Sequence, residues 1–434
     1  MALDKNLEEL VAANVITEET ALRISEYYRN KAEQPSNRFA IVLSILGSLL
    51  VGLGIVLVVA HNWDDLSPLV KTFFAFLPLV LGQSLCVFTL LKRKDSVAWR
   101  ESSAAILFFA IAACISLISQ IYHISGPLSG FLLTWILLGA PLIYVMRSLI
   151  TGLLYIAVLT WYACQAGYFE FPEQFPYLYF PLLLVLLPAY ADLYRNRHAG
   201  AYFGLYNWFI AISLLCVLGA FSTSGNRYEV FFAGYLALCC IYYLIGTNRF
   251  FERQPRLANP FIILGVCGIL LILYLWSFDF LWGSGLMGDR PGIRFNTGFP
   301  YIAGALLLVS VLLFARQLNA KGFNNISPAG LSAVVYVFCV VMFQTVISAG
   351  VLLINAWIVF IALYYVRKGS IRHHLGILNL GLVIIALLAV MRFFDDSIPF
   401  VWRGIFFLVA GIGFFAGNYV VIRRKKAMAL KQTE

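Results

Sequence analysis

Long runs of apolar residues, separated by short polar segments, follow one another along the chain from Phe39 almost to its end. A helix that crosses a membrane needs about 20 consecutive apolar residues. The pattern therefore predicts fourteen membrane spans joined by short loops. The predicted spans cover residues 39–60, 69–91, 102–122, 130–146, 149–166, 177–192, 201–221, 229–246, 259–280, 299–315, 329–347, 350–366, 374–391 and 399–421. The loops at 147–148 and 348–350 are so short that either pair of spans could instead be re-entrant.

The polar segment before the first run, residues 1–35, has a different pattern. Leu7 and Val11 recur at helical spacing, and Thr17 then stands before two glutamates as an N-cap of a second helix ending near Pro35. A helical hairpin of this size cannot hold a core of its own. We expect it to be cytosolic and to pack on the membrane domain or on a protein partner.

Composition supports an all-α, polytopic integral membrane protein with the lipid bilayer as its surroundings. Of the 434 residues, 61% are hydrophobic and only 12% are charged, whereas soluble domains carry roughly 25% charged residues. A soluble globular enzyme is therefore excluded. We divide the chain into a hairpin (1–35), a transmembrane helical domain (36–422) and a basic cytosolic tail (423–434).

Charge distribution predicts the orientation. Fourteen spans leave six of the 31 Lys and Arg residues on one side, and therefore 25 on the side that holds both termini. The six are Lys71, Arg227, Arg290, Arg294, Arg392 and Arg403. Basic residues concentrate in cytosolic loops, so both termini are predicted to be cytosolic. The net charge of +10 reflects this orientation, and no nucleic-acid partner is indicated.

Motifs for nucleotides, cofactors and metals are missing from the sequence. It contains neither a GxxxxGK[ST] motif nor a GxGxxG motif after a strand. All eight cysteines fall inside apolar runs, and none has the spacing of a zinc site. We therefore expect no nucleotide site, no cofactor, no metal and no catalytic residues that can be named.

One external polar site is a candidate. Two acidic residues and an imidazole follow the first span, and Gln120 and His123 close the third, where the i, i+3 spacing predicts a shared helix face. The candidate residues are His61, Trp63, Asp64, Asp65, Gln120 and His123. A carboxylate beside an imidazole could bind and release a polar head group. The alternative is a pair of solvated hairpin turns.

Other polar residues have plainer interpretations. Arg392, with Asp395 and Asp396, mixes charges as surface turns commonly do. Asn207 and Asn355 are uncharged residues inside predicted spans, and such groups usually join neighbouring helices.

Three stretches resemble a known family. They are LEELVAANVITEETALRI (7–24), LGSLLVGLGIVLVVAHNWDDLSPLVK (46–71) and ISQIYHISG (118–126). Together they resemble the bacterial family built on domain of unknown function 2157, over about the first third of the chain. The resemblance implies a bacterial inner-membrane protein and no particular activity. His61 departs from the family pattern, which suggests a small or apolar residue there, so the candidate site depends most on Trp63, Asp64 and His123.

Three functions remain open. Many short-looped spans without a soluble catalytic domain favour the transport of an amphipathic or envelope-related substrate. A non-catalytic scaffold or sensor is the alternative, with the hairpin docking a partner. The third is a membrane-embedded transferase acting at the external face, but lipid-dependent glycosyltransferases have a long first external loop, and here it has only about eight residues. An enzyme is therefore the less favoured class.

Overall fold

The computed structural model divides the chain into two compact units, residues 1–74 and 75–434. It describes residues 7, 11, 13, 15–33, 66–169, 175–196, 200–222, 228–252, 254–279, 282, 298–322, 326–342, 347–372, 374–393, 401, 404, 405, 408, 411–413 and 415. The first predicted span, 39–60, lies outside the described residues. The last, 399–421, does so except at scattered positions.

The first unit contains the helix that the sequence predicts after Thr17. Helix α2 covers Glu18–Glu33, and Thr17 Oγ1 accepts a hydrogen bond from the backbone N–H of Thr20 at 3.3 Å. Glu19 pairs with Arg23 one turn later at 2.8 Å. The predicted N-cap is therefore confirmed.

The described helices include nine that are long and apolar enough to cross a membrane, so the protein is an integral multi-pass membrane protein. They are α4 (Pro68–Lys92), α5 (Val97–Ile121), α6 (Leu128–Val145), α7 with its π-helical extension (Leu149–Phe169), α10 with its 3-10 extension (Ala201–Phe221), α11 (Tyr228–Gly246), α14 (Phe299–Lys321), α16 (Ile347–Ile371) and α17 (Leu375–Phe393). Two shorter apolar helices, α13 (Pro260–Leu275) and α15 (Ser332–Met342), also match predicted spans. The total of fourteen stays a prediction.

The predicted span at 177–192 is broken into two helices. Helix α8 covers Tyr179–Leu184 and α9 covers Leu187–Asn196, with a turn between them. Pro188 explains the break, because it lacks the N–H that would donate to the carbonyl of Leu184 and its ring clashes with that carbonyl. Tyrosine hydroxyls from the neighbouring helices satisfy carbonyls at the break: Tyr144 donates to Val185 O, and Tyr155 donates to Leu182 O.

The two tightest predicted turns have different outcomes. Helices α6 and α7 are both long enough to span, and Ser148 caps α7 by accepting from Thr151 N at 3.1 Å. The predicted turn at 348–350 is wrong, because α16 begins at Ile347 and continues through these residues. Ser348, Ala349 and Gly350 are therefore part of a helix.

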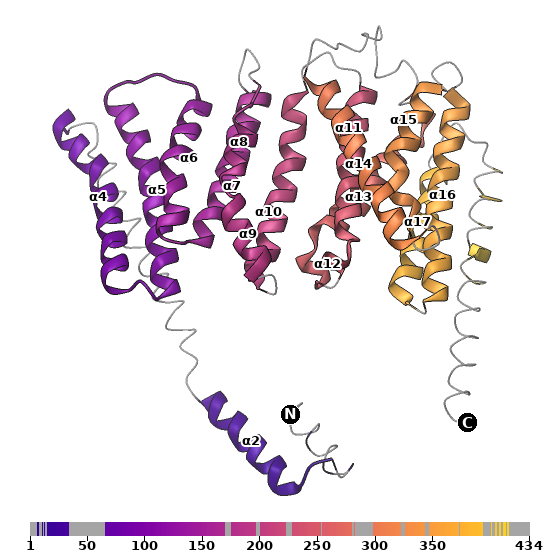
Figure 1. The fold of residues 1–434 in the computed structure, drawn as a ribbon, viewed down its shortest axis with the longest axis horizontal. Helices are drawn as coiled ribbons and strands as arrows, with labels where there is room; N and C mark the ends of the chain where they lie inside the picture. The colour runs from indigo at the N-terminus through magenta and orange to yellow at the C-terminus, as the bar shows by residue number, and fades with distance from the viewer. Residues whose placement is uncertain are drawn as a thin grey trace. The chain divides into compact units, whose positions relative to one another are not determined.

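Helix α11 is the centre of the second unit. It packs against α10, α13, α14 and α15, and Figure 1 shows α10, α11, α13 and α14 in the middle of the unit. Leu238 and Tyr242 belong to the core shared with α5, α7 and α10, while Leu236, Cys240 and Tyr243 belong to the core shared with α13, α15 and α16. One helix therefore connects both halves of the hydrophobic interior.

Glycines allow the closest helix contacts. A Cβ placed on Gly265 of α13 would lie 2.6 Å from the backbone nitrogen of Tyr243 on α11, and one on Gly381 of α17 would lie 2.6 Å from the carbonyl oxygen of Ala362 on α16. Small residues at such contacts are typical of membrane helices. They let the two backbones approach closely, and the resulting van der Waals packing stabilises helix association in lipid.

Candidate functional site

The structure describes only part of the external polar site that the sequence predicts. His61, Trp63, Asp64 and Asp65 lie outside the described residues, so the site itself stays a prediction. Gln120 and His123 are described and exposed.

The predicted shared helix face of Gln120 and His123 is wrong. Helix α5 ends at Ile121, and His123 lies beyond it in the left-handed conformation at φ 51°. The N–H of Ile124 donates back to Ser119 O at 2.9 Å, which is the closing hydrogen bond of a Schellman motif. His123 therefore occupies the position that terminates the helix.

Arg392 is also placed differently from the prediction. Its guanidinium donates to Ser277 O at 2.8 Å and to Ser277 Oγ at 2.6 Å, and it lies over the Phe278 ring at 4.3 Å. Asn355 Nδ2 donates to the same carbonyl at 3.0 Å. The interpretation of Arg392 as a solvated turn residue is wrong, since it joins the end of α17 to the residues after α13.

Asn207 and Asn355, both inside predicted spans, connect neighbouring elements, and Asn207 joins two helices as predicted. Asn355 connects α16 to Ser277, as above, and Asn207 of α10 accepts from the hydroxyl of Tyr190 on α9 at 2.7 Å. Only the Oδ1 of Asn207 is satisfied in this way, since its Nδ2 is buried without a hydrogen-bond partner among the described residues.

A polar pocket lies at one end of the second unit, between the ends of α11, α14 and α16. Its volume is about 300 Å³, within the lower range for small-molecule sites. The described lining residues are Tyr243, Thr247, Arg249, Glu252, Gln317, Ala320, Lys321, Ile326, Ser327, Lys368 and Arg372. Charge bias predicts that this end of the protein faces the cytosol.

The connection after α11 forms one wall. It contains the short helix α12 (Arg249–Glu252) and is held by Asn259, whose side chain is buried. Asn259 Nδ2 donates to Gly246 O at 2.9 Å and to Phe251 O at 3.1 Å, while its Oδ1 accepts from Ile262 N. An Asn directly before a Pro is a sequence signal for a helix start, so this residue could have been found from the sequence.

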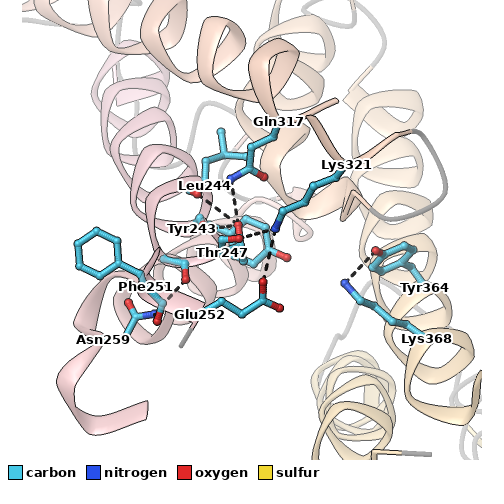
Figure 2. Close-up of polar contacts among 11 residues, drawn as sticks. Tyr243, Leu244, Thr247, Phe251, Glu252, Asn259, Gln317, Lys321, Tyr364 and Lys368 are labelled. Carbon is cyan, nitrogen blue, oxygen red and sulfur yellow. Dashed lines mark hydrogen bonds and ion pairs between the residues drawn. The ribbon is translucent and has the colours of Figure 1, made fainter. Parts of the chain in front are cut away.

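Helix α14 supplies the second wall. Gln317 Nε2 donates to Leu244 O, and Lys321 Nζ donates to Thr247 O (Figure 2). Lys321 also pairs with Glu252 at 3.7 Å. These contacts satisfy carbonyls at the C-terminal end of α11, where cations are favoured by the helix dipole.

Helix α16 supplies the third wall. Lys368 Nζ donates to the hydroxyl of Tyr364 at 3.2 Å and lies 5.2 Å from the centre of that ring. Figure 2 shows Lys368 facing the same space that Lys321 enters from α14. The exposed guanidinium groups of Arg249 and Arg372 complete the lining.

Hydroxyl groups line the inner part of the pocket. Tyr365 donates to the hydroxyl of Tyr243 at 3.1 Å, and Ser327 donates to Tyr365 at 3.4 Å. All three residues are buried. The pocket thus combines basic side chains with a floor of hydroxyl groups that can donate or accept.

Four basic side chains and one acidic one give the described lining a net charge of +3. This arrangement suits an anion. Among the described residues, no three His, Cys, Asp or Glu side chains are grouped to hold a metal ion. The sequence prediction missed the pocket because it treated these basic residues only as orientation signals. Nothing in a linear count shows that Arg249, Lys321 and Lys368 meet in space.

Comparison with known proteins bears out the resemblance. Residues 8–152 match the family model described as "Predicted membrane protein (DUF2157)". No curated protein and no solved structure matches the chain. The pocket, from Tyr243 to Arg372, lies outside the matched region.

Proposed function

We propose that this multi-pass membrane protein, whose residues 8–152 match the DUF2157 family model, translocates an amphipathic, envelope-related substrate across a bacterial inner membrane. The observation that carries this proposal is the basic pocket between the ends of α11, α14 and α16. A charged pocket at the end of membrane helices can take a polar head group while an apolar tail stays in the lipid.

The two helices that bring lysines to the pocket also have apolar exposed surfaces. Leu308 and Leu312 on α14, and Phe360 and Leu363 on α16, are each more than half exposed. In a bilayer such surfaces contact lipid chains or the tail of an amphipathic molecule. An amphipathic ligand therefore finds both kinds of surface on the same helices.

The break between α8 and α9 also supports translocation. Non-helical backbone at membrane depth occurs where it is buried in protein or lines a cavity, and interrupted helices are typical of transporters. At the start of α8, Ser213 of α10 accepts from Thr160 of α7 at 2.6 Å and is hydrogen-bonded to Tyr179 at 2.6 Å. Three helices therefore share hydroxyl groups in the interior of the domain.

The proposed topology has fourteen spans with both termini in the cytosol, and the pocket opens on the cytosolic side. The proposed domains remain the hairpin (1–35), the transmembrane domain (36–422) and the basic tail (423–434). The hairpin is where a protein partner would dock.

Translocation can be measured with the purified full chain in proteoliposomes. Fluorescent anionic amphiphiles, two phospholipids and one fatty acid, are placed in the inner leaflet, and their appearance outside is followed by a membrane-impermeant quencher. We expect faster appearance than in protein-free vesicles for at least one amphiphile. A double variant, Lys368→Gln with Arg372→Gln, removes two charges from the pocket and should slow this movement about tenfold or more.

The matched control is Arg367→Gln, which removes an exposed charge beside the pocket lining and should leave the rate unchanged. If no amphiphile moves faster than in protein-free vesicles, translocation is wrong. Binding of an amphiphile without movement would instead support the scaffold or sensor.

A further inference from the structure

Among the described residues, only one of the four basic side chains that line the pocket is paired with a carboxylate. Lys321 is engaged by Glu252 and Thr247. Within the described part of the chain, no carboxylate lies within 4.0 Å of the charged groups of Arg249, Lys368 or Arg372. Three cationic groups therefore face a shared volume of about 300 Å³ without a partner carboxylate there.

We propose that this pocket binds a phosphate group, carried either by a lipid head group or by a soluble phosphate compound. This inference rests on the proposed function and specifies the ligand of the same pocket. Phosphate oxygens accept strong, charge-assisted hydrogen bonds from ammonium and guanidinium groups. A phosphate with one or two negative charges offsets much of the +3 of the lining.

The arrangement of donors favours phosphate over carboxylate. Lys368 approaches from α16, Arg372 from just beyond the end of α16, and Arg249 from the connection after α11. Gln317, Lys321 and Ser327 line the same pocket but donate to the protein groups described above. A tetrahedral phosphate presents oxygens in several directions, whereas a planar carboxylate is satisfied by a single guanidinium fork.

The plainer interpretation is that these cations only cap helix ends. It accounts for Lys321, which donates to the backbone carbonyl of Thr247. It does not account for Lys368, whose described contacts are with the side chain of Tyr364 and not with a backbone carbonyl. Lys368 is therefore the residue whose substitution best distinguishes a ligand site from a set of helix caps.

Binding to the full chain in detergent can be titrated calorimetrically with inorganic phosphate, glycerol 3-phosphate and acetate. Bicelles containing phosphatidic acid or oleate test the corresponding lipids.

Lys368→Gln and Arg372→Gln should each weaken phosphate binding about fivefold or more, because each removes a unit charge near the ligand. Glu252→Gln should strengthen it about fivefold, since it raises the net charge of the lining. The exposed residues Arg367 and Arg316 lie on the same helices outside the lining, and their Gln variants should bind like the unmodified chain.

Binding of the soluble phosphates alone identifies a soluble compound, and binding of phosphatidic acid alone identifies a lipid head group. Acetate or oleate binding as tightly as the matching phosphate overturns the phosphate assignment. So does phosphate binding that is unchanged in Lys368→Gln and Arg372→Gln, or no binding of any phosphate probe. Charge-dependent phosphate binding in a chain that moves no amphiphile leaves the phosphate site standing and contradicts translocation alone.

Discussion

Glu101 is a buried acidic residue whose carboxylate caps the N-terminus of a membrane helix. It belongs to α5, yet its carboxylate accepts from the backbone N–H groups of Leu149 and Ile150, each at 2.9 Å, and from the hydroxyl of Ser148. The first N–H groups of a helix have no partner within the helix, and a negative charge there is favoured. Glu101, on α5, thus accepts the hydrogen bonds of the backbone N–H groups at the start of α7.

Glu101→Ala should lower the free energy of unfolding by about 3 kcal/mol or more, because it leaves two N–H groups at a buried helix start without an acceptor. Thermal unfolding of the purified protein in detergent measures this. Glu101→Gln keeps one acceptor oxygen and should be intermediate. Asp95→Ala, at an exposed loop position nearby, should stay within about 0.5 kcal/mol of the parent. Equal effects of the Glu101 and Asp95 variants would show that the capping contacts do not stabilise the fold.

Single residues were predictable from the sequence where the signal is local. Thr17 before two glutamates is a local signal, and the predicted cap forms. His123 and Arg392 were misjudged, because the first ends a helix in a left-handed conformation and the second bonds a serine 115 positions away. The clustering of the basic residues in the pocket was also not predictable from local sequence, because it depends on how α11, α14 and α16 pack.

At the scale of elements, most helix ends fall close to their predicted positions, because each is set by where an apolar run meets polar residues. The span predicted at 229–246 is α11, Tyr228–Gly246. Two elements differ for stated reasons. Pro188 breaks the span at 177–192. Ser348, Ala349 and Gly350 continue α16, because a few small residues do not end a helix.

The contact between α11 and α13 gives a prediction at this scale. Gly265→Leu places side-chain atoms where the Tyr243 backbone lies 2.6 Å from the Cβ position, so the helices must separate. We expect a loss of about 3 kcal/mol in the free energy of unfolding, the upper range for overpacking, and a lower yield of folded protein in detergent. Gly304→Leu on α14 is the matched control, since nothing lies within 4 Å of its Cβ position. A Gly265→Leu protein as stable as Gly304→Leu would contradict the close packing.

At the scale of the whole molecule, the orientation in the membrane decides on which face the pocket opens. The nine described helices that can span, the two shorter apolar helices and the broken pair α8–α9 all fall on predicted spans. In the fourteen-span topology that we propose, the pocket is expected at the cytosolic end, because its walls include the basic segments after α11 and at the end of α16. The proposed arrangement is therefore a basic pocket that opens to the cytosol.

Reporter fusions measure this orientation directly. A reporter active only in the cytosol, and its external counterpart, are fused after residues 95, 196 and 254, the last of which follows the α12 wall of the pocket. We expect a cytosolic signal at all three positions, as the excess of basic residues on that side requires. An external signal after residue 254 would place the pocket on the external face and contradict the proposed topology, in which the pocket opens to the cytosol.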